Sequence, residues 1–256
     1  MKFNTIVKAF TIFLICVGCK SKSTLIWEDN FDGTTLNEKY WNFELGDGCP
    51  NLCGWGNNEK QIYTKTNHEL KDGFLHINIK KGANNYSSTR ITTKGKKEFK
   101  YGRIEARAKL PLAKGLWPAF WMLGSNISEV GWPRSGEIDI LEYIGRKPNT
   151  VFTTLHFQEQ FGDKAYTKTT EIIGIEEGFH VYAVNWSPDK ISFFVDGKEL
   201  FNYNPTLKNE NNWPYDQPFY VILNTAVGGN LGGNDIDDHL FPQEFIIDYV
   251  RVYSNE

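Results

Sequence analysis

Residues 135–143, SGEIDILEY, place three carboxylic acids in a segment whose other residues are typical of a buried β-strand. Side chains alternate between the two faces of a strand, so Glu137 and Asp139 point to one face and the isoleucines beside them to the other. In a regular strand, Glu142 would then be buried with the isoleucines. One extra residue at Ile140–Leu141, a β-bulge, would reset the alternation and return Glu142 to the face of the other two acids.

The rest of the chain repeats the two-residue period of a strand. Apolar and polar residues alternate in 74–80 (FLHINIK) and 102–110 (GRIEARAKL), and the chain closes with a strand-like segment at 244–253 (EFIIDYVRVY). Asp196-Gly197 is a hairpin turn signal between two short strands in 191–200. We find no lasting helical period, repeat or linker, so we predict one all-β domain, a β-sandwich with Greek-key connections and one concave sheet face open to ligand.

The composition fits a folded domain that does not bind polyanions. Apolar residues make up 40% of the 256 residues, and the net charge of −3 gives no support for binding to nucleic acid or to an anionic membrane surface. Aromatic residues reach 15%, with eight tryptophans. Such a content suits the core of an all-β fold, and it equally suits a sugar-binding site, where indole faces stack on pyranose rings.

The N-terminus has the features of an export signal. Lys2 and Lys8 precede a short apolar run at 9–17, which is too short to span a membrane. A Gly-Cys pair ends the run and resembles a bacterial lipobox, in which Cys19 is lipidated and becomes the mature N-terminus. We therefore predict a lipoprotein signal peptide at 1–19; the alternative is an ordinary signal with an incidental cysteine.

The remaining chain divides simply under this interpretation. Residues 20–24 form a short tether and 25–256 form the folded domain. This domain is expected to be exported and to contact a bacterial membrane, either the outer membrane or the cell surface, only through its lipid. Export makes a disulfide between Cys49 and Cys53 plausible, and its expected role is to stiffen a loop. A metal site there is disfavoured because no further histidine or cysteine lies nearby in the sequence.

The acids of 135–143 suit one kind of chemistry. Two carboxyl groups that flank a glycosidic bond are the minimum equipment for its hydrolysis, one ionised and one protonated. A third acid can hold one of them by a hydrogen bond and raise the pKa of its neighbours. The alternative is a solvated acidic strand face, but no lysine or arginine alternates with the acids and the other face is apolar.

The segment GEIDILE resembles the bulged active-site signature of glycoside hydrolase family 16, Glu-x-Asp-x-x-Glu. Further segments resemble the laminarinase branch of that family in order and spacing: GWGNNEKQIYT, SSTRITTKGK, KYGRIEARAKLP, GLWPAFWMLG, YVILNTAVGGNLGG and IDYVRVY. The resemblance implies a jelly-roll β-sandwich of the concanavalin A type with a substrate cleft on its concave face. It also implies that Glu137 is the nucleophile, Glu142 the acid/base and Asp139 the supporting acid.

Several tryptophans are candidates for sugar binding. Trp117 and Trp121 share one strand face about 13 Å apart, a spacing that suits either a core pair or two stacking platforms. The family resemblance favours the cleft, where both form glycone subsites. Trp132, just before the acids, and Trp55, in the cysteine loop, are candidates for the cleft rim. The other tryptophans are expected in the core: Trp27, Trp41, Trp186 and Trp213.

Four polar residues match family positions in the cleft. His156 resembles the histidine beside the catalytic subsite, although a lone strand histidine is often structural. Asn57, Arg90 and Asn224 match positions that hydrogen-bond sugar hydroxyls, and an asparagine amide offers the donor and the acceptor that a hydroxyl requires.

The resemblance also implies one structural Ca²⁺ on the convex face, far from the catalytic acids. Its ligands would be Glu28, the carbonyl of Gly73 and Asp248, all hard oxygen donors. The alternative is that Asp248 only caps an exposed strand. No catalytic cofactor is expected.

We therefore predict a monomeric, retaining endo-glycosidase that cleaves β-1,3 bonds in laminarin-type β-glucan by double displacement. Alternatives on the same fold are a mixed-linkage glucan hydrolase, a hydrolase of red-algal galactan such as agar, and a transglycosylase. A non-catalytic glucan-binding lipoprotein is the alternative from another class, although such proteins lose one or both catalytic glutamates. The loop at 49–53 is not a general family feature, and it leaves the exact glucan preference open.

Overall fold

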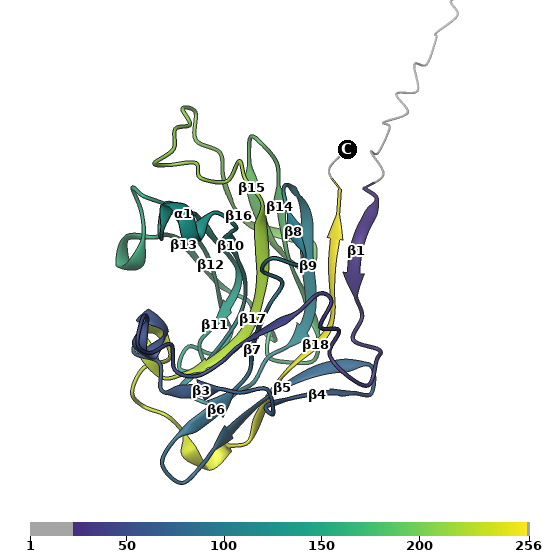
Figure 1. The fold of residues 1–256 in the computed structure, drawn as a ribbon, viewed down its shortest axis with the longest axis vertical. Coiled ribbons are helices and arrows are strands. Elements are labelled where there is room, and N and C mark those ends of the chain that lie inside the picture. Colours follow the sequence, from purple (N-terminus) through teal and green to yellow (C-terminus); the bar gives the residue numbers. More distant parts are fainter. Residues whose placement is uncertain (1–22, 255–256) are drawn as a thin grey trace, which may run out of the picture.

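The computed structural model describes residues 23–254, which form two β-sheets packed face to face. Figure 1 shows the smaller sheet bent, with its hollow side turned away from the larger sheet. Nearly all strand pairs are antiparallel, and β3 with β6 is the parallel exception among the described pairs. The predicted jelly-roll β-sandwich is confirmed. The predicted signal peptide and Cys19 lie outside the described residues, and strand β1 begins at Leu25, where we predicted the domain to begin.

The larger sheet has ten strands and forms the convex side of the sandwich, at the right of Figure 1. Its main path runs β16-β15-β14-β9-β18-β5-β6-β3, with β1 paired to β18 and β4 paired to β5. Its strands are β1 (Leu25–Asp29), β3 (Gln61–Tyr63), β4 (His68–Lys71), β5 (Phe74–Lys81), β6 (Tyr86–Ser88), β9 (Gly102–Lys109), β14 (His180–Trp186), β15 (Ile191–Val195), β16 (Lys198–Tyr203) and β18 (Gln243–Tyr253).

The smaller sheet has eight strands and carries the acids. Its path runs β13-β12-β11-β10-β17-β7-β2, with β8 paired to β17. Its strands are β2 (Asn42–Glu44), β7 (Arg90–Thr92), β8 (Glu98–Phe99), β10 (Leu116–Gly124), β11 (Glu137–Tyr143), β12 (Thr150–His156), β13 (Tyr166–Glu171) and β17 (Phe219–Val227).

In the part of the chain that the structure describes, helical structure is limited to single turns in the loops. They are η1 (Cys53–Gly56), α1 (Ile127–Val130), η2 (Gly162–Lys164), α2 (Gly229–Gly232) and η3 (Asp238–Leu240). Among residues 23–254, no helix has the length and apolar content needed to span a membrane.

The strands predicted from the alternation of residues are confirmed. The segments at 74–80, 102–110 and 244–253 fall in β5, β9 and β18. Asp196 and Gly197 connect β15 to β16, and both have positive φ, as a tight hairpin turn with a right-handed strand twist requires. The period of two therefore identified three central strands of the larger sheet, β5, β9 and β18.

One continuous apolar core fills the space between the sheets. Ile104 and Ala106 of β9 face Phe120 and Met122 of β10 and Ile138 of β11 across this space, and each is at most 1% exposed. The tryptophans expected in the core are all buried there: Trp27, Trp41, Trp186 and Trp213. Burial of this apolar surface, at about 25 cal/mol per Å², is the main favourable term that holds the sheets together.

The predicted bulge is present in β11. Asp139 pairs with Thr154 of β12, and the next paired residue, Glu142, lies opposite Phe152, so β11 advances three residues while β12 advances two. The neighbouring strand β10 shows the matching register shift. The extra residue lets Ile140 and Leu141 both enter the core, where both are fully buried, and leaves Glu142 on the concave face.

Candidate active site

The strand register brings residues from distant parts of the sequence into rows across the concave face. One row joins Tyr220, Leu123, Glu137 and His156. The next row joins Asn42, Thr92, Ile222, Trp121, Asp139, Thr154 and Thr167. A third row joins Glu44, Arg90, Asn224, Ala119 and Glu142. The three acids thus occupy three successive rows, and each has different neighbours.

Glu142 is buried and held by donors from two strands. Trp117 of β10 donates its indole N–H to Oε1 at 3.0 Å, and Thr154 of β12 donates its hydroxyl to Oε2 at 3.2 Å. Burial raises the pKa of Glu142 from the ordinary 4.5 to about 8. The negative charges of Asp139 and Glu137 add to this shift, whereas His156 and the bond from Thr154 oppose it. Glu142 is therefore a protonated acid at neutral pH.

Asp139 and Glu137 form a second, closely linked pair. Burial raises the pKa of Asp139 well above its usual range, and the charge of Glu137 and a hydrogen bond between the two side chains act in the same direction. A protonated Asp139 can therefore donate to the Glu137 carboxyl group. Trp132, in the loop before β11, donates its indole N–H to Glu137 Oε2 at 2.8 Å. These contacts fix the Glu137 carboxylate on the concave face.

His156 completes this group at the end of β12. The backbone N–H of Gly162 donates to its Nδ1 at 3.2 Å, so in the neutral ring the proton lies on Nε2. Nε2 lies 3.4 Å from Asp139 Oδ2 and 3.8 Å from Glu137 Oε1. The predicted position of His156 beside the acids is confirmed, and its ring presents an N–H to both of them.

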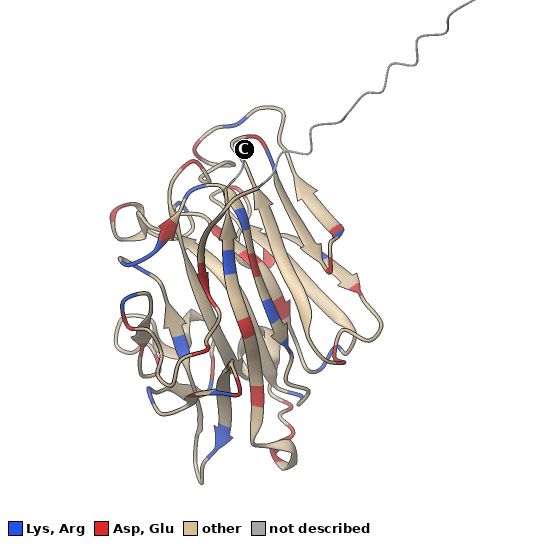
Figure 2. Ribbon diagram, turned by 90° about the vertical axis from the view of Figure 1, so that its right-hand side faces the viewer, with Lys and Arg blue, Asp and Glu red and all other residues tan. Residues whose placement is uncertain are grey.

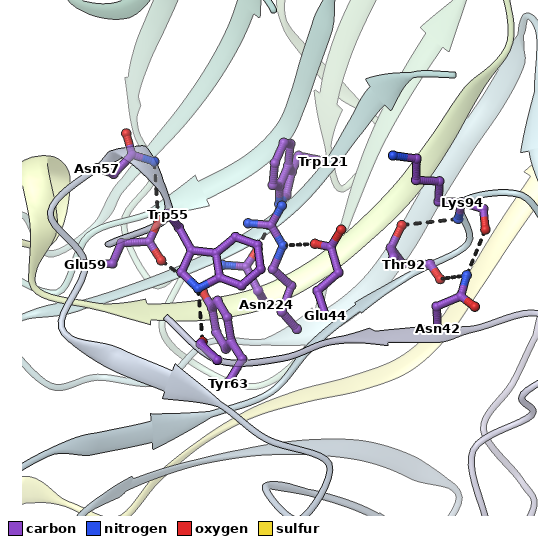
Figure 3. Close-up of polar contacts among 12 residues, drawn as sticks. Asn42, Glu44, Trp55, Asn57, Glu59, Tyr63, Thr92, Lys94, Trp121 and Asn224 are labelled. Atoms are coloured by element: carbon purple, nitrogen blue, oxygen red, sulfur yellow. Dashed lines mark hydrogen bonds and ion pairs between the residues drawn. The ribbon is translucent and has the colours of Figure 1, made fainter. Parts of the chain in front are cut away.

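The far side of the concave face is built around Arg90. Its guanidinium lies between two indoles, with its central carbon 4.4 Å from the ring centroid of Trp55 and 4.9 Å from that of Trp121. Its Nε is bound to the carboxylate of Glu44. Figure 3 shows Glu44, Trp55 and Trp121 gathered around this point. Two aromatic faces and one carboxylate thus hold a buried cation that is only 9% exposed.

A hydrogen-bond chain connects this cluster to the centre of the sheet. Glu59 accepts hydrogen bonds from Asn57 at 3.3 Å, from Gln61 at 2.6 Å and from the Tyr63 hydroxyl at 3.2 Å. Asn224 of β17 donates to the Tyr63 hydroxyl at 2.9 Å (Figure 3) and accepts from the Trp121 indole N–H at 2.8 Å.

Burial of Glu59 raises its pKa, although the positive charge of Arg90 and the three donors oppose the shift. The chain of bonds orients Trp121 and therefore the aromatic faces that hold Arg90.

The disulfide loop places Trp55 over Arg90. The predicted disulfide between Cys49 and Cys53 is present. Trp55 lies two residues after Cys53 with a φ of 52°, a left-handed conformation that is strained for a bulky side chain. Its indole N–H donates to the carbonyl of Gly46 at 3.2 Å, so the loop is closed on itself. The loop therefore holds Trp55 in a conformation that an isolated chain would avoid.

Most predicted site residues lie together on the concave face, but several have roles that the sequence did not indicate. Trp117 and Trp121 share this face as predicted, and each also donates an indole N–H, to Glu142 and Asn224 respectively. Trp132 is 45% exposed, which suits the predicted rim. Both ends of the Asn224 amide are bound within the protein, so the structure supports a positioning role for it. Stacking of sugars on these tryptophans stays a prediction.

Sequence reasoning missed Glu44, Glu59, Tyr63 and Thr154. Glu59 and Gln61 alternate in burial with their exposed neighbours Lys60 and Ile62, but the sequence shows no matching alternation of polar and apolar residues, so no sequence signal indicated them. Glu44 carries no such signal, because its strand β2 has only three residues and its partner Arg90 is far away in the sequence.

Two of the three proposed calcium ligands are engaged elsewhere. Glu28 binds the side chain of Arg251 at 3.1 Å, and Asp248 is paired with Arg107. Gly73 forms part of the turn between β4 and β5. Figure 2 shows acidic and basic residues interleaved along the strands of the larger sheet. Both carboxylates would have to leave an arginine to bind a cation, so the side chains as they stand do not fit a calcium site.

Calcium binding stays a prediction, which a fall in melting temperature on chelation would support. Within residues 23–254, Glu137, Asp139 and His156 are the only group of three or more potential metal-ligating side chains whose ligand atoms gather within 4.8 Å. That group lies among the acids on the concave face, far in the fold from the proposed calcium ligands of the larger sheet.

Two carboxyl groups on one strand of a concave β-sheet, one of them a buried acid with a raised pKa, are the arrangement that hydrolysis of a glycosidic bond requires. The chain belongs to glycosyl hydrolases family 16, whose sequence model matches residues 56–250.

Known proteins agree with this assignment. The fold is similar to that of a laminarinase from Flavobacterium sp. UMI-01, with a TM-score of 0.89 and 61% identity over 90% of this chain and 100% of that one. The chain is 39% identical to glucan endo-1,3-beta-glucosidase A1 of Niallia circulans over 91% of its length, and 37% identical to a beta-glucanase of Rhodothermus marinus over 90%. It spans 38% of the Niallia protein and 84% of the Rhodothermus protein.

Proposed function

We propose that this chain is an endo-acting β-1,3-glucanase that hydrolyses laminarin-type β-glucan with net retention of anomeric configuration. The observation that carries the proposal is the unequal environment of the two glutamates. Burial raises the pKa of Glu142 to about 8, whereas Glu137 accepts a hydrogen bond from the Trp132 indole N–H and lies beside Asp139. A pair of carboxyl groups in different protonation states is what a retaining glycosidase requires.

In the first step, the Glu137 carboxylate attacks the anomeric carbon while Glu142 gives its proton to the glycosidic oxygen. The sugar becomes covalently bound to Glu137, and the shortened chain leaves with its new hydroxyl. The N–H of Trp132 and the proton of Asp139 hold Glu137 in position for attack. The bond to Glu137 forms as the glycosidic C–O bond breaks, and the proton from Glu142 reaches the departing oxygen in the same step, so the leaving chain departs as an alcohol and not as an alkoxide.

The second step reverses the role of Glu142. The charge of Glu137 disappears once it is esterified, and that charge is one of the causes that raise the pKa of Glu142. The pKa of Glu142 therefore falls in the intermediate, which suits its new role as a base that takes a proton from water. Water attacks the anomeric carbon, Glu137 leaves as a carboxylate, and Glu142 is protonated again.

The choice of β-1,3-glucan is supported by the relatives named above, whose names describe laminarinase and endo-1,3-β-glucosidase activities. The relatives do not favour a galactan substrate. A non-catalytic glucan-binding protein is disfavoured because Glu137, Asp139 and Glu142 are all present and arranged on one face.

A panel of laminarin, mixed-linkage glucan and agar, with sizing of the products, tests the substrate. Laminarin should be cut to oligosaccharides of intermediate size, as an endo-acting enzyme requires. Proton NMR of the first products tests the mechanism, because the β-anomer should appear before mutarotation equalises the two. A first product with the α-anomer would contradict the role of Glu137 as nucleophile.

Glu137→Ser separates catalysis from binding. We expect turnover to fall by several orders of magnitude, because the two glutamates act in concert. Calorimetric titration with a laminari-oligosaccharide should still show binding, since the aromatic and hydroxyl-binding residues remain. Loss of binding in a folded variant would place Glu137 among the binding residues instead.

We also propose that the protein is exported and attached to a membrane through a lipid on Cys19. The support is the order of basic residues, apolar run and Gly-Cys pair at the N-terminus. Cys19→Ser should move the enzyme from the membrane fraction to the soluble fraction. A variant that still sediments with membranes would remove the anchor from this account.

A further inference from the structure

Two threonine hydroxyls form a short chain beside Glu142. Thr154 of β12 donates to Glu142 Oε2 at 3.2 Å, and Thr167 of β13 donates to the Thr154 hydroxyl oxygen at 3.2 Å. The two threonines are directly paired across β12 and β13. Thr154 is buried, whereas Thr167 lies exposed on the edge strand, so the chain runs from the acid/base to the margin of the sheet.

The two oxygens of Glu142 have donors of different kinds. The Trp117 indole N–H can only donate, so it holds Oε1 as an acceptor in both protonation states. A hydroxyl can donate or accept, because its hydrogen rotates. Thr154 can therefore donate to Oε2 when Glu142 is ionised and accept from Oε2 when Glu142 is protonated. Thr167 supplies a hydroxyl partner to Thr154 in either orientation.

This property matches the demands of the proposed double displacement, on which the inference rests. Glu142 loses its proton to the glycosidic oxygen in the first step and regains one from water in the second. A buried carboxyl group whose partner could serve only one state would leave an unsatisfied polar atom in the other, which costs about 1–3 kcal/mol. A rotating hydroxyl avoids this cost in both steps.

We propose that Thr154, supported by Thr167, is a positioning residue that holds the acid/base Glu142 in both of its protonation states. Thr154 does not touch the reacting atoms, and it acts through the Glu142 carboxyl group. The indole of Trp117 fixes one oxygen and the hydroxyl chain adapts at the other. The Trp117 indole and the threonine hydroxyls together keep the Glu142 carboxyl group in one place while its proton leaves and returns.

The charged groups around Glu142 also influence its pKa, and they must stay the same when Thr154 is substituted. Asp139 and Glu137 act on it from its own strand β11, and His156 acts from β12, while β10 contributes the neutral indole of Trp117. None of these groups is altered by a substitution of Thr154. A shift in the titration of Glu142 in such a variant therefore reports the loss of the hydroxyl.

The test is the pH dependence of kcat/KM on laminarin for Thr154→Val, which keeps the shape of the side chain and removes the hydroxyl. Hydrogen bonds to charged groups are about twice as strong as neutral ones, so the carboxylate loses more than the acid does. We expect the alkaline limb of the pH profile, where kcat/KM declines as Glu142 ionises, to move to higher pH by about half to one unit. The kcat should fall about tenfold, with KM changed less than twofold. Thr154→Ser should restore the limb, and Thr167→Val should shift it less in the same direction.

Thr153 provides a matched control on the same strand. Its side chain faces the opposite side of the sheet, and its buried hydroxyl has no hydrogen-bond partner in the part of the chain that the structure describes. Thr153→Val should fold, melt at or above the wild-type temperature and leave the limb unchanged. An unshifted limb in Thr154→Val, or an equal shift in Thr153→Val, would overturn the proposal.

The proposed function and this inference fail in different ways. If the wild-type enzyme degrades none of the polysaccharides in the panel, the proposed function is wrong. If the wild type degrades laminarin and Thr154→Val shows the wild-type limb, only the role of Thr154 is wrong. A melting curve for each variant separates a local change at Glu142 from a loss of fold.

Discussion

Replacing Glu142 with glutamine should make the protein more stable, and the gain should depend on pH. In the folded protein, burial raises the pKa of Glu142 from 4.5 to about 8. An acid whose pKa is higher in the folded state than in the unfolded state contributes its full stabilisation only at pH values below the unfolded-state pKa. This contribution to the free energy of unfolding is lost as the pH rises to the folded-state pKa. Wild-type stability should therefore fall between about pH 4.5 and pH 8 because of this group.

The magnitude follows from the same shift. Each pKa unit corresponds to about 1.36 kcal/mol, so at pH 7, about 2.5 units above the unfolded pKa, Glu142 lowers the free energy of unfolding by about 3 kcal/mol. Glutamine is neutral in both states and carries no such penalty. Its amide oxygen can accept from Trp117, and its amide group can donate to the rotating hydroxyl of Thr154, so both present contacts have a replacement.

Thermal unfolding measured from pH 4.5 to 8.5 tests this reasoning. A domain of this size gains roughly 2–4 °C per kcal/mol, so Glu142→Gln should melt about 6–12 °C above the wild type at pH 7. The difference should approach zero at pH 4.5 and stop growing above about pH 8. Glu210→Gln is the control, because Glu210 is exposed in a loop. A melting difference that stays the same at every pH would refute the assignment of Glu142 as a buried protonated acid.

Three further predictions concern the activity of the enzyme. The kcat/KM on laminarin should fall about tenfold per pH unit above about pH 8, as Glu142 ionises; an alkaline limb that begins below pH 6 would contradict this. Cys49→Ser combined with Cys53→Ser should raise KM several-fold with little change in kcat, because the loop holds Trp55 on Arg90 far from the acids; an unchanged KM would show that the loop does not need its disulfide. Trp132→Phe keeps a ring but loses the bond to Glu137, so kcat should fall about 10- to 100-fold, since hydrogen bonds to charged groups contribute about 1.5–3 kcal/mol; a variant with wild-type kcat would show that Asp139 alone positions Glu137.

The sequence predicted the features that depend on local pattern. The bulge in β11 was visible because its signal, an acid displaced by one position, lies within nine residues. The core tryptophans, the Asp196-Gly197 hairpin and strands β5, β9 and β18 of the larger sheet were predictable because alternation and turn residues act over short distances.

The remainder of the site depends on register between strands that are distant in sequence. Thr154 reaches Glu142 only because β12 is shifted against β11 by the bulge. Glu44 binds Arg90 only because β2 pairs with β7. The direction of an indole N–H is likewise set by its neighbours, so Trp117 was predicted as a stacking platform and its bond to Glu142 was not. A carboxylate paired with an arginine, as at Asp248, has the same sequence as one free to bind a metal.

The bulge also explains how one strand can carry three acids without losing the fold. Burying an isolated carboxylate is costly, so each acid needs either a proton or several donors. Because the bulge spreads the acids over three rows, each meets a different set of neighbours: His156 beside Glu137, Thr154 beside Asp139 and Glu142, and Trp117 beside Glu142. The environments of Glu137 and Glu142 therefore differ, and this difference is the basis of the proposed mechanism. The burial that keeps Glu142 protonated at neutral pH also lowers the free energy of unfolding at that pH. A variant such as Glu142→Gln, which removes the titrating group, should therefore gain stability and lose activity.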